Sequence, residues 1–191
     1  MKANGIQFSR VWAMPSADTF DVEPIKGFVQ KYLMKSKCSV DLFARNKRWA
    51  TYTNDLNPDT AAQYHMDAED FAKMLHAAQV RPDLIIFDPP YSPRQVSEMY
   101  SGIGRTTTIT DTQMVTIRKG SKNVLMEMAG PGTVVLSFGW NSSGMGFERG
   151  FEIIEILLVC HGSFHNDTIC MAERRLESHP ELNFPIDMPP P

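Results

Sequence analysis

Apolar residues follow two different periods along this chain, and short polar, glycine-containing or proline-containing stretches separate them. In three segments the apolar residues recur every three to four positions, which is typical of amphipathic helices. In six other segments they form short continuous or alternating runs, which indicate β-strands. The first pattern predicts helices over 24–34, 68–79 and about 111–129, the last interrupted by Gly120. The second pattern predicts strands over 38–43, 49–54, 83–87, 133–138, 151–159 and 168–174.

The order of these segments predicts an α/β fold. Strands that alternate with helices usually form a mostly parallel sheet. The last two strands are joined by the short turn 161–167, so we expect a C-terminal hairpin that adds an antiparallel strand at or near one edge. The longest apolar runs, such as 153–160 with Glu155 inside it, are too short for a transmembrane helix.

Length and composition indicate one globular domain. The chain has 191 residues, of which 42% are hydrophobic and 21% charged, and this excludes a disordered or collagen-like chain. We expect a single domain over 1–183 and a proline-rich extended tail over 184–191. The N-terminus shows no secretory signal. The three cysteines are odd in number and lack CxxC spacing, which favours a reduced, cytoplasmic protein without a zinc site.

The charge of the chain is acidic overall but uneven. A net charge of −3 and a pI of about 5.9 exclude a protein that simply coats nucleic acid, because such proteins are basic. Basic residues dominate 31–48 and 92–122, whereas acidic residues dominate 52–91. Basic patches beside an acidic pocket are compatible with a nucleic-acid enzyme. Charge alone favours the simpler interpretation, solvated surface faces.

The sharpest motif is the tetrad Asp88-Pro89-Pro90-Tyr91 at the end of the apolar strand 84–87. Ligands of open α/β sheets bind at the carboxyl ends of the strands, so the tetrad stands where a ligand is expected. The alternative is a rigid Pro-Pro turn that merely leads the chain out of a strand.

The tetrad suits the methylation of an exocyclic amino group, whose nitrogen lone pair is delocalised into the ring of the base. The Asp88 carboxylate can accept one amino hydrogen, and a main-chain carbonyl of Pro89 or Pro90 can accept the other. The two prolines have no N–H, so the loop offers acceptors only. Tyr91 can stack on the base, which must leave a duplex to reach such a pocket.

With this motif the chain resembles the small adenine-specific (N6) DNA methyltransferases that are common in phages. The resemblance covers most of the chain. Besides the tetrad it rests on the stretches 10–20, 53–58, 91–95, 137–142 and 165–169. It implies a reduced Rossmann-like methyltransferase fold that uses S-adenosylmethionine as its cofactor.

Residue by residue, the resemblance makes Asp88, Pro89, Pro90 and Tyr91 the catalytic tetrad. It implies that Asp55 binds the ribose hydroxyls of the cofactor and that Asp67 binds its adenine amino group. For Asp55 and Asp67 alone, helix capping would explain the acids equally well. The implied cofactor-binding set is Phe20, Asp41, Phe43, Ala44, Arg45, Asp55, Asp67 and Asp88.

The first-strand motif departs from the family pattern Asp-Pro-Phe-x-Gly-x-Gly. Arg45 and Lys47 occupy the glycine positions, and Asn46 could adopt the left-handed conformation instead. Only 13 residues separate Asp41 from Asp55, so the helix that usually follows the first strand must be very short or absent. Either Arg45 pairs with the carboxylate of the cofactor or cofactor binding is lost. We favour retained binding because the acids at 41, 55, 67 and 88 are all present.

The turn 161–167 invites a metal interpretation through His161, His165 and Asp167, but these residues lie within one tight turn and no further partner is apparent. A turn satisfied by its own polar side chains is simpler. In the family fold the sixth strand runs parallel to the fourth and fifth, so this turn is expected at the same edge as Asp88. Residues of this turn and of the end of the fifth strand could then contact the target strand. They are Phe164, His165, Asn166, Trp140 and Asn141.

A long target-recognition region, usual in such enzymes, has no room in this chain. The candidate substitute is the loop 92–110, which carries Arg94 and Arg105 and whose glycines suggest a mobile lid. Specificity should therefore be short or relaxed, or supplied by a second protomer in a homodimer or by a partner.

We expect an S-adenosylmethionine-dependent methyltransferase of adenine N6 in DNA, with a flipped-out adenine as its substrate and with no metal and no membrane partner. One alternative is a methyltransferase of an amino group in RNA or in another base. The other is a non-catalytic nucleic-acid-binding subunit that has lost cofactor binding, which the altered positions 45 and 47 support.

Overall fold

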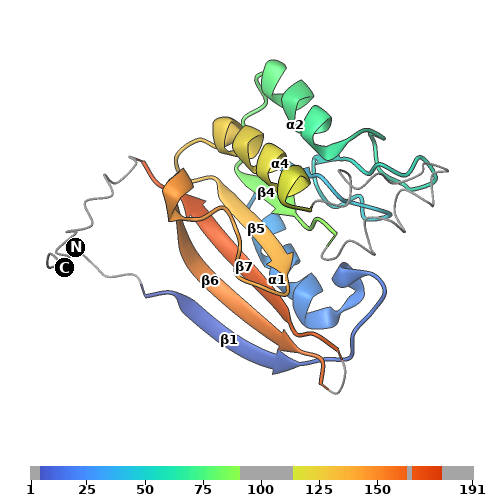
Figure 1. Ribbon diagram of the computed structural model, residues 1–191, viewed down its shortest axis with the longest axis vertical. Helices are drawn as coiled ribbons and strands as arrows, with labels where there is room; N and C mark the ends of the chain where they lie inside the picture. The colour runs from blue at the N-terminus through green and yellow to red at the C-terminus, as the bar shows by residue number, and fades with distance from the viewer. Residues whose placement is uncertain (1–4, 91–113, 163–164, 178–191) are drawn as a thin grey trace, which may run out of the picture.

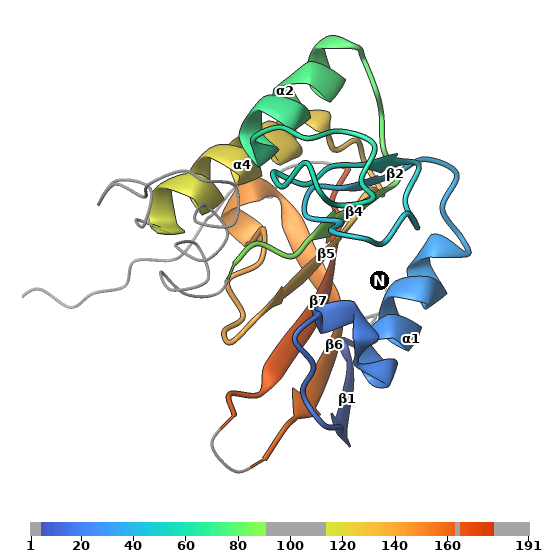
Figure 2. The same cartoon turned by 90° about the vertical axis from the view of Figure 1, so that its right-hand side faces the viewer.

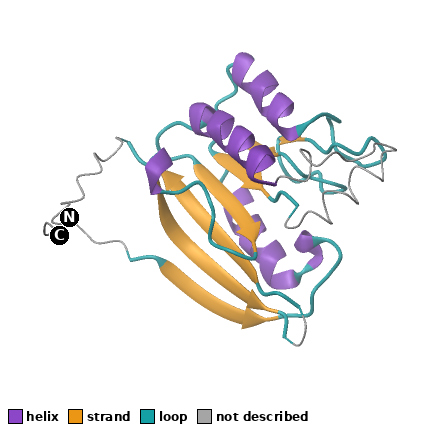
Figure 3. Cartoon of the chain, viewed as in Figure 1, coloured by secondary structure: helices purple, strands orange, loops and turns teal. Residues whose placement is uncertain are grey.

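The computed structural model describes residues 5–90, 114–162 and 165–177. Within these residues seven strands form one sheet in the order β1-β6-β7-β5-β4-β2-β3 (Figures 1 and 3). The strands are β1 (Gln7–Trp12), β2 (Ser39–Asp41), β3 (Tyr52–Thr53), β4 (Leu84–Phe87), β5 (Val134–Gly139), β6 (Phe151–Cys160) and β7 (Thr168–Arg175). The helices are α1 (Glu23–Leu33), α2 (Ala68–Ala77) and α4 (Met114–Met128), with short 3-10 helices η1 (Thr19–Asp21) and η2 (Phe147–Arg149).

The sheet is mostly parallel, as the alternation of strands and helices predicts. Strands β3, β2, β4 and β5 pair in parallel, and β7 pairs antiparallel with both β5 and β6. Strand β6 therefore runs in the same direction as β4 and β5, and β1 pairs with it in parallel. The predicted hairpin of β6 and β7 is confirmed, but it lies inside the sheet, because β1, a strand that the hydrophobic pattern did not predict, lies outside β6.

Helices cover both faces of the sheet (Figure 2). Helix α1 packs on one face, against Leu84 and Ile86 of β4 and Leu136 of β5. Helices α2 and α4 pack on the other face, against Ile85 and Phe87 of β4. Successive residues of β4 thus enter opposite cores, which explains why this strand is apolar throughout.

The helix predicted over about 111–129 continues through Gly120 rather than being interrupted there. Its described part runs from Met114 to Met128, so residues 111–113 of the predicted helix lie outside the described residues. A Cβ at Gly120 would lie 2.0 Å from Oε2 of Glu69 in α2. Glycine at this position therefore leaves room for the carboxylate of Glu69 and does not break the helix.

The connection from β2 to β3 confirms the expectation of a very short or absent helix. Residues 42–51, all of them described, contain no helix. Beyond β3, an isolated parallel bridge joins Asn54 to Tyr64 and extends the sheet by a single pair. Among the residues that the structure describes, none of the helices is long and apolar enough to cross a membrane.

Candidate active site

Six strands run in the same direction, so their carboxyl ends meet at one edge of the sheet. The segments that leave the strands here bring together the acids that the sequence singles out. These segments are 13–18 after β1, 42–47 after β2, 54–57 after β3, 88–90 after β4 and 140–146 after β5.

The last residue of β2, Asp41, is completely buried at this edge. Its Oδ1 accepts a hydrogen bond of 3.0 Å from the backbone N–H of Phe43. Its Oδ2 is buried as well, and it has no hydrogen-bond partner in the part of the chain that the structure describes. Burial raises the pKa of Asp41 well above its usual value, the N–H of Phe43 opposes this shift, and the charges of Asp88 and Asp55 add to it. The site thus holds a carboxyl group that is poorly satisfied without a ligand.

The loop after β2 adopts the backbone conformation that the missing glycine would favour. Arg45 has a φ of 49°, so the left-handed residue is Arg45 itself and not Asn46. In this conformation the N–H of Arg45 donates to Oδ2 of Asp55 at 3.0 Å. Oδ1 of Asp55 accepts a second bond from the N–H of Asn57 at 2.9 Å. Asp55 thus holds two turns together and does not cap a helix.

Asp67, in contrast, is the N-cap of α2, as helix capping would predict. Its Oδ1 accepts a hydrogen bond of 2.8 Å from the N–H of Glu69. Capping uses one carboxylate oxygen, so a contact of the second oxygen with a ligand is compatible with the cap.

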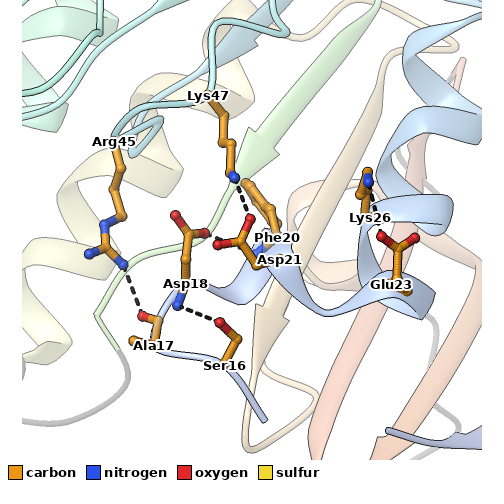
Figure 4. Close-up of polar contacts among 9 residues, drawn as sticks. All are labelled: Ser16, Ala17, Asp18, Phe20, Asp21, Glu23, Lys26, Arg45 and Lys47. Atoms are coloured by element: carbon orange, nitrogen blue, oxygen red, sulfur yellow. Dashed lines mark hydrogen bonds and ion pairs between the residues drawn. The ribbon is translucent and has the colours of Figure 1, made fainter. Parts of the chain in front are cut away.

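Two basic side chains of the loop after β2 reach across to the segment that precedes α1 (Figure 4). The guanidinium of Arg45 donates to the carbonyl oxygen of Ala17 at 3.0 Å. The ammonium of Lys47 lies 2.5 Å from Oδ1 of Asp21. These contacts connect β1 and η1 to the loop after β2, a connection that the sequence pattern does not reveal.

The two aromatic residues of the predicted cofactor set pack against other rings. Phe20 is only 3% exposed and belongs to the core under α1. Its ring centre lies 5.9 Å from that of Trp49 and 5.2 Å from that of Phe138. Phe43 is partly exposed and meets the edge of Phe87, with ring centres 5.8 Å apart. Phe20 therefore supports the carboxyl edge through its packing in the core under α1.

The tetrad leaves β4 at the centre of this edge. Asp88 and Pro90 are partly exposed and Pro89 is buried. The Asp88 carboxylate is near enough to Asp41 for its charge to raise the pKa of Asp41. Three predicted site residues, Tyr91, Arg94 and Arg105, lie outside the described residues, as does the whole of the predicted lid 92–110.

A small cavity of about 10 Å³ lies beside Pro89, with room for about one water molecule. The loop after β5 forms one of its walls through Asn141, Ser143 and Gly144. Ser137 of β5 lines it too, and its buried Oγ has no hydrogen-bond partner among residues 5–90, 114–162 and 165–177. Asn141 and Pro89 thus line the same cavity.

Trp140 and the turn between β6 and β7 lie at the same edge of the sheet as Asp88. The side chain of Trp140 is 45% exposed, and His165 and Asn166 are exposed in the turn. Phe164 lies outside the described residues. The expectation that this turn shares the edge of Asp88 is confirmed, because β6 is parallel to β4.

His161 and Asp167 of this turn are satisfied by hydrogen bonds within the turn and to its neighbours. The ring nitrogens of His161 contact the carbonyl oxygen of Ala13 and the hydroxyl of Thr168, each at 2.9 Å. Oδ1 of Asp167 accepts from the N–H of His161 at 3.1 Å. Within the described residues, no three His, Cys, Asp or Glu side chains are grouped as metal ligands would be.

Two buried charged residues near the site were not singled out from the sequence. Lys122 in α4 is 8% exposed and Glu173 in β7 is 1% exposed, and both bind the loop after β5. A signal was available for Glu173, because it follows the apolar run 169–172, where an unpaired charge would be costly. Lys122 gave no such signal, because Lys119, Gly120, Ser121 and Asn123 surround it in the sequence.

No family profile and no curated protein sequence matches the chain. Solved structures do match. NSun6 from Pyrococcus horikoshii, solved with SFG, has a TM-score of 0.51 and 10% identity over 78% of this chain and 51% of its own. SMU.776, described as a candidate methyltransferase and solved with SAH, has a TM-score of 0.48 and 14% identity over 77% and 48%. HI0767 from Haemophilus influenzae, a candidate methylase, has a TM-score of 0.45 and 12% identity over 86% and 92%.

The chain spans about half the length of NSun6 and of SMU.776. At identities this low the similarity concerns the fold. The predicted fold class is confirmed: the chain has an α/β fold with a mostly parallel sheet and an antiparallel β6–β7 hairpin, and this fold is similar to that of NSun6.

Proposed function

We propose that the chain is an S-adenosylmethionine-dependent methyltransferase that acts on the exocyclic N6 amino group of adenine in DNA. The observation that carries the proposal is the position of Asp88 and the two prolines. They leave the central strand β4 at the carboxyl edge, beside the buried carboxyl of Asp41. This edge is where open α/β sheets bind ligands.

The residues at the edge fit a cationic cofactor. The Oδ2 atom of Asp41 is buried without a hydrogen-bond partner among the described residues, and the charges of Asp88 and Asp55 act on the same carboxyl group. A ligand with an ammonium and a sulfonium group would relieve both the missing hydrogen bond and the mutual repulsion. When bound, S-adenosylmethionine would supply the electrophilic methyl group.

The cofactor would be held by the residues that the sequence predicts. Asp41 would hold its ammonium group, and Asp55 and Asp67 its adenosine part. Phe43 and Ala44 follow Asp41 directly and would border the cofactor. A guanidinium has five N–H donors, so Arg45 can bind the cofactor carboxylate while it keeps its hydrogen bond to Ala17. Phe20 would support these residues through its packing in the core under α1.

The chemistry falls to the tetrad. The Asp88 carboxylate would accept a hydrogen bond from one N–H of the amino group. A carbonyl oxygen of Pro89 or Pro90 would accept a hydrogen bond from the other N–H. Two acceptors in fixed positions hold the nitrogen so that its lone pair points away from them, toward the methyl donor. Because the prolines offer no N–H, nothing in Pro89-Pro90 competes for the acceptors. Tyr91 would stack on the ring.

Duplex DNA can enter such a site only if the adenine leaves the stack. Trp140 carries an exposed aromatic surface for stacking at this edge. Asn141, His165 and Asn166 would offer polar contacts to the strand that carries the flipped base, together with Phe164, Arg94 and Arg105.

A second candidate function has one observation in its favour. Arg45 and Lys47 replace the family glycines, and both side chains bind the segment before α1. A loop tied down in this way could belong to a nucleic-acid-binding subunit that no longer uses a cofactor. The presence of an intact tetrad and of an ill-satisfied Asp41 argues for the enzyme.

Incubation with S-adenosylmethionine and either a DNA duplex or an RNA of the same sequence, followed by digestion to nucleosides, tests the proposal. We expect N6-methyladenine from the DNA. Methylation of the RNA alone would assign the alternative substrate. If calorimetry shows no binding of the cofactor at millimolar concentration, the subunit interpretation replaces the enzyme.

A further inference from the structure

The loop that follows β5, residues 140–146, is held by hydrogen bonds to two buried side chains of opposite charge. Lys122 in α4 donates from its Nζ to the carbonyl oxygens of Ser143 and Gly144, at 2.5 and 2.6 Å. Both acceptors belong to the segment that lines the cavity beside Pro89. The loop's carbonyl groups are therefore held from the helical side.

The amide groups of the same loop are held from the sheet. Oε2 of Glu173 in β7 accepts from the N–H of Met145 at 2.6 Å, and Oε1 accepts from the N–H of Gly146 at 2.8 Å. Four consecutive residues, 143–146, are thus bound through two carbonyls and two amides. Each of these hydrogen bonds has a charged partner, which makes it stronger than a bond between neutral groups.

The backbone at Gly144 leaves no room for a side chain. A Cβ there would lie 1.9 Å from Oε2 of Glu173 and 2.6 Å from Cε of Met171. Glu173 is 1% exposed and uses both of its oxygens, so it cannot swing aside without losing its bonds to the loop. The loop therefore approaches β7 as closely as a glycine backbone permits.

Stability alone does not account for this arrangement. Burying two charges costs several kcal/mol each in desolvation, and well-packed apolar side chains often hold a fold equally well. What the charged pair adds is a fixed position for an irregular loop. The functional residues Trp140 and Asn141 lie directly before the fastened segment, and Asn141 is joined to it because its Oδ1 accepts from the N–H of Ser143 at 3.0 Å.

We propose that Lys122 and Glu173 are positioning residues that fix the loop 140–146 as a rigid wall of the target-base site. This inference rests on the proposed function. Trp140 and Asn141 would then meet the flipped base in one geometry, and part of the specificity that a longer recognition region would supply would come from this wall. Neither Lys122 nor Glu173 needs to touch the substrate.

The test compares Glu173→Gln with Glu155→Gln. Both are buried carboxylates in adjacent strands, but Glu155 faces α1, where it binds Lys31 and Tyr32, away from the loop. We expect Glu173→Gln to raise the KM for DNA by about tenfold or more, the equivalent of about 1.4 kcal/mol, with unchanged affinity for S-adenosylmethionine. Glu155→Gln should lower the Tm without changing this KM.

Hydrogen exchange of the Met145 and Gly146 amides supplies a readout that is independent of activity. In Glu173→Gln these amides should exchange about tenfold faster or more, and in Glu155→Gln at the wild-type rate. If Glu173→Gln does not fold, Lys122→Gln, which keeps the Glu173 carboxylate and removes the charged donor to Ser143 and Gly144, carries the same two measurements.

A KM no higher than that of Glu155→Gln, or unchanged exchange, would overturn the positioning role while leaving the methyltransferase intact. A wild-type protein that methylates neither DNA nor RNA would instead overturn the proposed function, and with it the role of the loop as a substrate wall. Accelerated exchange in such a protein would restrict Lys122 and Glu173 to a structural role.

Discussion

Asp41 is the residue whose protonation state should respond most clearly to a ligand. Its pKa is raised by burial, so the folded, ligand-free protein holds this proton to a higher pH than the unfolded chain does. The folded state therefore binds more protons in the range from the ordinary Asp pKa of about 3.9 up to the raised value. Folding stability is consequently lost as the pH rises through that range.

Asp41→Asn should remove this dependence. The ligand-free variant should gain stability relative to the wild type as the pH rises, because the amide has no charge to desolvate, and the difference should fade toward pH 4. Its affinity for S-adenosylmethionine should fall, because the variant lacks the negative charge. Urea unfolding at several pH values measures the first effect and calorimetry the second. Parallel stability–pH curves would contradict the assignment.

Arg45 combines a strained backbone with a side chain in use, and two substitutions separate these features. Arg45→Gly and Arg45→Ala both remove the guanidinium, but only glycine adopts the φ of 49° without a penalty, which for other residues is about 1–2 kcal/mol. Arg45→Ala should therefore be the less stable of the two in urea unfolding.

If Arg45 binds the cofactor carboxylate, both variants should weaken cofactor binding by about 1.5–3 kcal/mol, the range for a hydrogen bond to a charged group. DNA binding without cofactor should change less. If Arg45 instead holds DNA phosphates, cofactor affinity would stay unchanged and the salt dependence of DNA binding would become shallower. Both affinities, measured across a salt series, distinguish these roles.

At the scale of the elements, Asp67 has one observed role, the N-cap of α2, and one proposed role in cofactor binding, and substitutions can separate the two. Asp67→Ala should lower the free energy of unfolding by about 1 kcal/mol through loss of the α2 N-cap, whereas Asp67→Asn keeps the cap. Both should weaken cofactor binding if the carboxylate contacts the adenine amino group. Normal cofactor affinity in Asp67→Asn would limit the residue to capping.

Hydrophobic periodicity predicted three helices and six strands because each of them buries one face or both. It missed β1, where the large apolar residues Phe8 and Trp12 are exposed and, within the strand, only Val11 packs against the core under α1. It also read Gly120 as a break, because a close approach of two helices is a tertiary contact with no local signal.

The candidate site was also predictable only in part from the sequence. The position of Asp88 after a buried strand was predictable from the motif, and so was the set of acids. The left-handed Arg45, the contacts with Ala17 and the binding of the loop after β5 by Lys122 and Glu173 were not. They arise between segments that are far apart in the sequence, and only the folded chain brings them together.

At the scale of the whole molecule, the fold places the acids Asp41, Asp55 and Asp88 and two candidate substrate loops at one edge of one sheet. In the proposed function, methyl transfer depends on Asp88. Asp88→Ala should raise the activation barrier by about 3 kcal/mol or more, because a preorganised contact to the reacting group is lost. The fold should remain, since Asp88 is partly exposed.

The most direct measurement is therefore transfer of a labelled methyl group from S-adenosylmethionine to a defined DNA duplex, with identification of the modified nucleoside. Wild-type protein and Asp88→Ala are compared at equal, calorimetrically verified cofactor saturation. We predict N6-methyladenine from the wild type and a rate lower by at least about a hundredfold from the variant. Equal rates, or a wild type that leaves every adenine unmodified, would contradict the central claim.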